Sequence, residues 1–239
     1  MLICMIAPGK MFYFLIGGIF FLIPKRKFAN AKQFWIVNCG MILLGIITFA
    51  IFKFQFLSDY VGTSGTQSVM DPTTVNYSIS NILGNIPNSI NVLFNTYLDR
   101  AEFYFNTMIG SSLGWFQVNI SSIVISGFVV VLLGTSICST KEEIIAYPID
   151  KKFRYINLLF SFLMFMGILA ALWIGWTPIS YNYIEGVQGR YFLPFLPMVL
   201  FTFRNKTVIL QKDVNRWLGL STYVLLMFTF LSIVPYVIG

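Results

Sequence analysis

Four long stretches of uncharged, mostly apolar residues constrain the fold of this chain more than any other feature. They are residues 34–53, where only Lys53 at the end is charged, and residues 118–140, 155–184 and 217–239, which carry no charge. A helix needs about 20 apolar residues to cross the roughly 30 Å of hydrocarbon in a bilayer, and each stretch supplies them. The sequence therefore predicts four membrane-spanning helices.

Two further uncharged stretches, residues 11–23 and 191–203, contain only 13 residues each. An ideal helix of that length reaches about 20 Å, so these segments are half-helices or extend into polar flanks. Pro194 and Pro197 interrupt the second one, as is typical of broken helices that line a cavity or are buried in protein. We predict an all-α fold: a polytopic membrane helix bundle, one membrane domain over residues 1–239, with about six membrane segments, two of them short or broken.

The overall composition agrees with a membrane protein and excludes several kinds of catalytic site. Hydrophobic residues make up 57% of the chain and charged residues only 10%, against about 25% charged residues in soluble domains. Histidine is absent, which excludes Ser-His-Asp triads and histidine metal sites within this chain. The three cysteines, Cys4, Cys39 and Cys138, lack metal-ligand spacing. We predict no cofactor, and a divalent metal has no clear site.

Positive residues are concentrated in alternate loops, which predicts the orientation in the membrane. The loops 24–33, 141–154 and 204–216 hold twelve of the sixteen lysines and arginines. Cytoplasmic loops of membrane proteins carry an excess of these residues, so we expect these three loops to be cytoplasmic. The same distribution explains the net charge of +7, and no nucleic-acid partner is needed to account for it.

Residues 57–117 form the one predicted external segment long enough to have structure of its own. Its first part, residues 58–76, is rich in Gly, Ser, Thr and Asp and is typical of an irregular loop. Apolar residues then recur at intervals of three and four: Ile79, Ile82, Leu83, Ile86, Ile90, Leu93, Phe94 and Tyr97. This periodicity predicts an amphipathic helix, bent at Pro87. It lies in the outer membrane interface or packs over the outer end of the bundle.

The nine residues 186–194, Gly-Val-Gln-Gly-Arg-Tyr-Phe-Leu-Pro, place an arginine and a glutamine between glycines at the start of the broken segment. Glycines let a backbone approach a ligand closely, and arginine binds phosphate or carboxylate in bidentate fashion. A structural alternative is that Arg190 reaches the lipid headgroups or pairs with Glu185. The candidate binding residues are Arg190, Gln188, Gly189, Glu185 and Tyr191.

The motif at 186–194 resembles the signature of the DUF2142 family, predicted polytopic membrane proteins of bacteria. Residues 7–10 (Ala-Pro-Gly-Lys), 23–28 (Ile-Pro-Lys-Arg-Lys-Phe) and 108–115 (Met-Ile-Gly-Ser-Ser-Leu-Gly-Trp) are similar to further elements of that family. The resemblance covers nearly the whole chain. It implies a multi-pass protein of the bacterial cell membrane, and that this chain is the C-terminal part of a longer protein.

The family's hydrophobic architecture resembles that of multispanning transferases that use lipid-linked sugars. The resemblance therefore implies a glycosyltransferase that uses a polyprenyl-phosphate-linked sugar to modify a surface glycopolymer at the outer face. Arg190 and Gln188 would bind the phosphate of this lipid donor, and Asp99 or Glu102 would act as the acid or base. In such enzymes the acidic residue usually lies in a first external loop near the N-terminus, and we expect this chain to lack that loop.

Two other functions remain open from the sequence. A transporter or flippase for lipid-linked glycans also uses broken helices and an intramembrane arginine. Several ionisable residues along one groove would favour transport, whereas a single anion-binding arginine beside an external carboxylate would favour transfer. The third alternative is a non-catalytic membrane subunit. The partners expected are membrane lipid and a polyprenyl-phosphate-linked sugar, and the sequence identifies no protein partner.

Overall fold

The computed structural model describes residues 23, 27–60, 73–113, 118–140, 150–204, 208–210 and 214–238. These residues are mostly helical, which confirms the predicted all-α class. The chain divides into two compact units, residues 1–101 with 159–187 and residues 102–158 with 188–239. The division falls within two helices, each of which contributes residues to both units. The prediction of one membrane domain over residues 1–239 stays a prediction.

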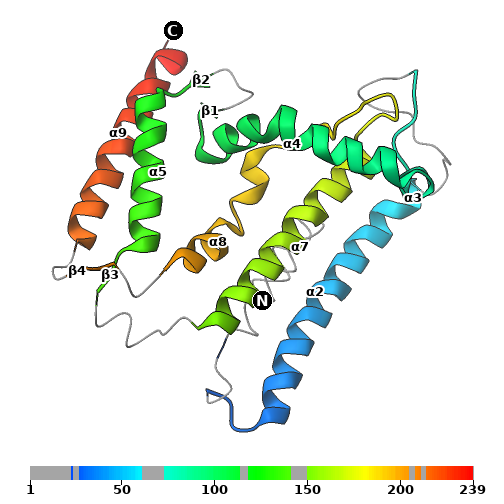
Figure 1. Ribbon diagram of the computed structural model, residues 1–239, viewed down its shortest axis with the longest axis horizontal. Coiled ribbons are helices and arrows are strands. Elements are labelled where there is room, and N and C mark those ends of the chain that lie inside the picture. Colours follow the sequence, from blue (N-terminus) through cyan, green and yellow to red (C-terminus); the bar gives the residue numbers. More distant parts are fainter. Residues whose placement is uncertain are drawn as a thin grey trace. The chain divides into compact units, whose positions relative to one another are not determined.

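Helices supply most of the described structure, and four two-residue strands join their ends (Figure 1). The helices are α2 (Ala31–Tyr60), α3 (Ile79–Gly84), α4 (Ile86–Ile109), α5 (Ser122–Ile137), α7 (Lys151–Gly175), the 3-10 helix η3 (Gly189–Phe192), α8 (Leu196–Phe203) and α9 (Asn215–Ile238). The strand pairs are β1 (Ser112–Leu113) with β2 (Val118–Asn119), antiparallel, and β3 (Ser139–Thr140) with β4 (Ile209–Leu210), parallel.

Three of the described helices are long and apolar enough to cross a membrane: Ala31–Thr48 within α2, the whole of α7, and Asn215–Tyr236 within α9. Each overlaps a predicted span and begins two to four residues before it. Helix α5 has 16 residues and extends about 24 Å as an ideal helix, so it is shorter than the predicted span at 118–140. The predicted short segment at 11–23 lies outside the described residues except for Ile23.

The predicted span at 155–184 is too long at its outer end, because α7 stops at Gly175. Pro178 follows shortly after, and a proline disfavours helical geometry at the residue before it, here Thr177. The final turn closes through the backbone N–H groups of Trp176 and Thr177, which both donate to the Leu172 carbonyl oxygen. Residues 191–203 are broken as predicted, into η3 and α8.

Helix α7 buries two polar side chains together with large apolar ones, and it exposes further large apolar side chains. Its buried face repeats at the helical intervals of four, three and four residues, through Asn157, Ser161, Met164 and Ile168. The Asn157 side-chain nitrogen donates to the Met198 carbonyl oxygen of α8. Tyr155, Leu158 and Phe162 are exposed on the same helix. The exposed apolar side chains suit a helix in lipid, where buried polar residues such as Asn157 also make helix contacts.

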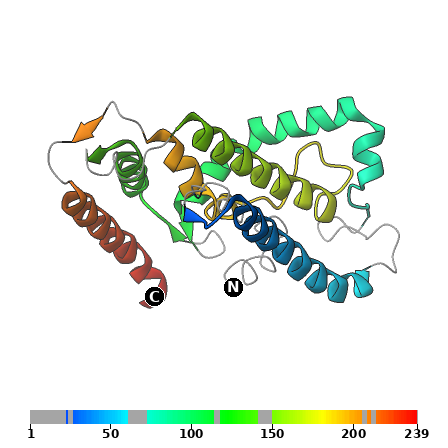
Figure 2. The ribbon, with the colours of Figure 1, turned by 90° about the horizontal axis from the view of Figure 1, so that it is seen from below.

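In the second unit, α5 and α9 pack side by side, as both ribbon views show (Figures 1 and 2). A β-carbon at Gly127 of α5 would lie 2.6 Å from Leu225 Cδ2 of α9. One at Gly134 would lie 3.5 Å from Leu218 Cδ2. Helix α5 also packs against α8. Glycine at these positions lets the helices approach closely without a hydrophobic driving force.

The predicted external helix is two helices rather than one bent helix. Ser78 caps α3 by accepting from the Asn81 backbone N–H, and the Asn81 side chain accepts from the Ser78 backbone N–H in return. The helix breaks at Asn85, and α4 begins at Ile86. Pro87 lies in the first turn of α4, where a missing backbone N–H removes no helical hydrogen bond.

Helix α4 presents three distinct faces. The buried face consists of Ser89, Val92, Thr96, Tyr104 and Thr107. The exposed apolar face consists of Ile86, Ile90, Phe94, Tyr97 and Phe105. The exposed polar face consists of Asn91, Asp99 and Glu102. The apolar stripe is exposed, so it does not pack against the described part of the bundle. Of the two predicted positions for this stripe, the exposure favours the lipid interface.

This arrangement predicts that the two exposed faces of α4 meet different surroundings in a bilayer. In a background with Cys4, Cys39 and Cys138 replaced by serine, a fluorophore attached at Phe94→Cys should be quenched by shallow spin-labelled lipids. The matched label at Asn91→Cys, on the polar face, should instead be quenched by aqueous iodide. Equal iodide quenching at both positions would mean that the helix is surrounded by water.

Candidate functional site

The segment between α7 and α8 carries the Gly-Val-Gln-Gly-Arg motif and contains, as regular structure, only the short helix η3. An irregular backbone leaves N–H groups that no helix or sheet satisfies, and a buried N–H without a partner is costly. The segment therefore needs acceptors from outside its own backbone. Threonine side chains provide three of these acceptors.

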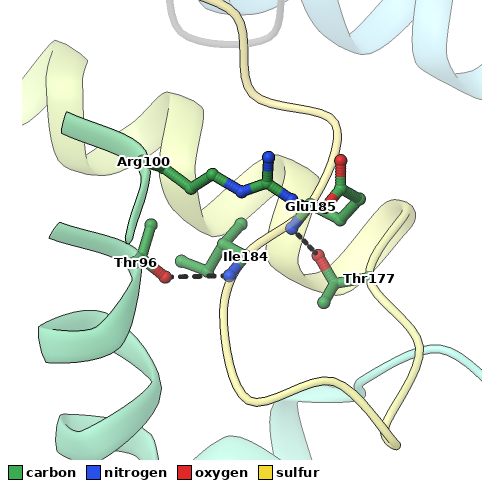
Figure 3. A network of polar contacts seen from close by, with 5 residues as sticks. All are labelled: Thr96, Arg100, Thr177, Ile184 and Glu185. Atoms are coloured by element: carbon green, nitrogen blue, oxygen red, sulfur yellow. Dashed lines mark hydrogen bonds and ion pairs between the residues drawn. The ribbon is translucent and has the colours of Figure 1, made fainter. Parts of the chain in front are cut away.

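In the first unit, two threonine hydroxyls accept from the backbone before the motif (Figure 3). The Ile184 N–H donates to Thr96 Oγ1 over 2.8 Å, and the Glu185 N–H donates to Thr177 Oγ1 over 3.1 Å. Thr177 and Ile184 are 0% and 1% exposed, so water cannot substitute for either contact. Thr96 comes from α4 and Thr177 from the end of α7, and together they fix the backbone at residues 184–185.

The residues preceding α3 pair with the residues following α7. The Tyr77 N–H donates to the Thr177 carbonyl oxygen over 3.0 Å, and the Ile179 N–H donates to the Val75 carbonyl oxygen over 2.9 Å. The Tyr77 hydroxyl donates to the Tyr181 carbonyl oxygen over 3.0 Å. Residues 75–77 were predicted to be external, and residues 177–181 were predicted to lie within the span 155–184, at the end that leads to the external motif.

Glu185 is held by Arg100 of α4, whereas the sequence suggested Arg190 as its partner. Arg100 Nη2 lies 2.7 Å from Glu185 Oε2, with side-chain exposures of 30% and 22% (Figure 3). The guanidinium carbon of Arg100 also lies 4.4 Å from the centre of the Tyr183 ring, a cation–π contact. The negative charge of Glu185 is therefore already compensated within the first unit.

Both glycines of the motif are required by contacts within the protein. Gly186 has a φ of +80°, the left-handed region that favours glycine, and a β-carbon there would lie 2.5 Å from the Trp176 ring. In the second unit, a β-carbon at Gly189 would lie 1.8 Å from the Tyr104 carbonyl oxygen. The Gly189 N–H donates to Thr107 Oγ1 over 2.8 Å. The close approach at Gly189 is therefore made to α4.

Arg190 follows this contact point and is exposed at the start of η3. Its side chain has no ion pair or hydrogen bond among the residues that the structure describes. Two residues later, Phe192 is buried and packs edge-on against Tyr104, with ring centres 5.8 Å apart. Gly189 and Phe192 thus anchor the turn on α4, while Arg190 projects away from the packed side.

Gln188 and Tyr191 flank the arginine. The side-chain oxygen of Gln188 is buried and has no hydrogen-bond donor within the described part of the chain. Such a group is uncommon in proteins, because an unsatisfied buried acceptor costs about 1–3 kcal/mol. Tyr191 is half-buried, and its backbone N–H donates to the Gln188 carbonyl oxygen over 2.9 Å. Within the described residues, the Arg190 guanidinium and the Gln188 side-chain oxygen are therefore the polar groups of the motif that have no hydrogen-bond partner.

The two candidate carboxylates, Asp99 and Glu102, are both exposed on α4. Glu102 precedes Thr107 by five residues, which is about 140° around an ideal helix. It therefore lies on a different side of α4 from the contact with Gly189. Asp99 is next to Arg100 in the first unit, and Arg100 pairs with Glu185 instead. Within the described residues, no three acidic or cysteine side chains group together as metal ligands would.

Thr96, Thr107 and Thr177 were not among the residues predicted to form the site. A signal was present: Ser89, Thr96 and Thr107 follow one another at intervals of seven and eleven residues. These intervals are close to two and three helical turns, so the three hydroxyls share one face of α4. The apolar stripe was the stronger pattern, and the prediction placed that stripe in the outer membrane interface or against the bundle.

The family described as Predicted membrane protein (DUF2142) matches residues 1–199 of this chain. The chain belongs to this family. The match includes the motif at 186–194 and ends within α8, and the described apolar helices agree with a multi-pass membrane protein. No curated protein and no solved structure matches the chain. Family membership assigns this member to the membrane and leaves its activity to be proposed from the site.

The Arg100–Glu185 ion pair predicts a selective effect on stability. Glu185→Gln should lower the stability of the first unit by about 1 kcal/mol, because the pair is partly buried and Arg100 loses its carboxylate. Glu102→Gln on the exposed face of α4 is the matched control and should have no effect. Thermal unfolding of the protein in detergent, followed by tryptophan fluorescence, measures both. Equal melting temperatures for the two variants would contradict the assignment.

The close packing of Gly189 against α4 predicts that Gly189→Ala lowers stability more than Glu185→Gln does. Gly189→Ala places a methyl group against backbone atoms of α4 and should destabilise the second unit by about 3 kcal/mol. Gly219→Ala is the control, since a β-carbon there meets nothing within 4 Å. The yield of monodisperse protein and its melting temperature report the difference. Normal behaviour of Gly189→Ala would show that the turn is not seated on α4.

Proposed function

We propose that this protein is a membrane glycosyltransferase that takes its sugar from a polyprenyl-phosphate donor at the outer face of the membrane. The proposal rests on the exposure of Arg190 and on the fixed position of its backbone. Arg190 is an exposed cation on a turn whose neighbours, Gly189 and Phe192, are seated firmly on α4. The acid nearest to it in sequence, Glu185, is neutralised by Arg100.

A fixed position matters because a phosphate ligand is recognised by geometry as well as charge. The planar guanidinium of arginine donates two parallel hydrogen bonds to phosphate oxygens. A turn that is already ordered loses little entropy when the ligand binds. Arg190 therefore meets both requirements for holding the donor phosphate.

Gln188 is proposed for a different role from the one that the sequence suggested. Its buried side-chain oxygen is a hydrogen-bond acceptor, and a phosphate oxygen cannot donate to it. A sugar hydroxyl can donate to it and would satisfy the group. We therefore assign the donor phosphate to Arg190 and a hydroxyl of the donor sugar to Gln188, with Tyr191 beside them.

The proposed reaction exchanges one carbon–oxygen bond for another. The bond between the anomeric carbon of the sugar and the phosphate oxygen breaks, and an acceptor hydroxyl oxygen bonds to that carbon. A general base takes the hydroxyl proton as the new bond forms. Polyprenyl phosphate leaves with an additional negative charge, which Arg190 stabilises more strongly than the charge of the bound donor.

Binding of the leaving group tests the role of Arg190 directly. Native mass spectrometry of the purified protein with polyprenyl monophosphate should show binding that weakens roughly tenfold or more in Arg190→Gln. The affinity of Arg190→Lys should lie between those of the parent and Arg190→Gln, because lysine keeps the positive charge and loses the planar guanidinium. Arg216→Gln, the same change of charge at the start of α9, should bind as the parent does. Polyprenol, which lacks the phosphate, should not distinguish the variants.

Equal binding of polyprenyl phosphate to the parent and Arg190→Gln would overturn the assignment of Arg190. Release of polyprenyl phosphate from a labelled polyprenyl-phosphate sugar in proteoliposomes tests transfer itself. Movement of that donor across the bilayer without release would instead favour the transporter. Gln188→Ala should reduce release while leaving the affinity for polyprenyl monophosphate unchanged, since that ligand carries no sugar.

A further inference from the structure

A cavity of about 330 Å³ lies in the second unit, where α5 and α8 end and α9 begins. Six of its twelve lining residues lie beyond residue 199, where the family match ends. None of its lining residues lies within 186–194, so the cavity is separate from the motif. Its polar lining consists of Thr135, Ser136, Cys138, Ser139, Thr140, Arg204 and Asn215.

Among the described residues, the charges that line this cavity favour an anion. Arg204 lines it. Arg154 is not part of the lining, and its Nη2 donates to the Arg204 carbonyl oxygen over 2.6 Å. The first turn of α9 adds partial positive charge. The carboxyl ends of α5 and α8 add partial negative charge of about half a unit each, which the full charge of Arg204 and the first turn of α9 together outweigh. The hydroxyls of Ser136 and Ser139 add neutral hydrogen-bonding groups.

The remaining walls are apolar and lead toward lipid. Leu200, Phe201 and Leu218 line the cavity, and Phe201 is 53% exposed. A ligand that fits has an anionic head and an apolar tail. We propose that this cavity binds the phosphate group of a membrane phospholipid. The basic loops predict that it opens at the cytoplasmic leaflet, opposite to the side proposed for sugar transfer.

Cys138 lines the cavity and can report on its occupancy. The protein with Cys4→Ser and Cys39→Ser is placed in neutral detergent, and the rate of maleimide modification of Cys138 is measured. Phosphatidylglycerol, phosphatidylcholine and inorganic phosphate are added separately. Phosphatidylglycerol should slow the reaction, with an apparent affinity about tenfold weaker in Arg204→Gln. The control Arg216→Gln, exposed on the first turn of α9, should behave as the parent does.

The three additions separate the possible ligands. Protection by inorganic phosphate as strong as that by phosphatidylglycerol would assign the cavity to a free anion and overturn the lipid. Equal protection in parent and Arg204→Gln would show that apolar contact alone fills the cavity, against the proposal. Absence of protection by phosphatidylglycerol would also overturn it. Phosphatidylcholine carries a phosphate but no net charge, so weaker protection by it is expected.

Discussion

Buried backbone N–H groups that must find an acceptor are the constraint on which the rest of this structure depends. The segment after α7 leaves helical geometry at Gly175 and stays irregular up to η3. Its N–H groups at Ile184 and Gly189 are buried away from water, and each donates to a threonine of α4. An unsatisfied group of this kind costs about 1–3 kcal/mol, so the hydroxyl face of α4 decides where the segment lies.

This constraint also explains which face of α4 is buried and which is exposed. An amphipathic helix that served a soluble core would bury Ile90 and Phe94, but here the hydroxyl face is buried and the apolar face is exposed. Lipid can cover apolar side chains, whereas only protein can satisfy the irregular backbone. Helix α4 supplies Thr96 to the first unit and Thr107 to the second. Arg190 follows the second of these contacts, and its guanidinium is therefore available to a ligand.

The sequence predicted features that depend on local pattern. Charge-free runs located α2, α7 and α9, and two prolines predicted the break between η3 and α8. The ion pair of Arg100 with Glu185 was not predictable, because it joins residues 85 positions apart in sequence and both had nearer candidates. The close contact of Gly189 with the Tyr104 backbone was not predictable either, since a glycine in a motif does not indicate which surface it approaches. In both cases the tertiary fold determined the partner.

Hydrogen exchange of the segment before η3 tests this account most directly. Peptides covering residues 184–189 should exchange slowly in the parent protein in detergent, as buried and bonded amides do. Thr107→Val, which keeps the shape and removes the acceptor, should accelerate exchange at Gly189. Thr222→Val should not, because the Thr222 hydroxyl donates to Leu218 within its own helix. Rapid exchange of residues 184–189 in the parent, or no effect of Thr107→Val, would contradict the claim that α4 holds this segment.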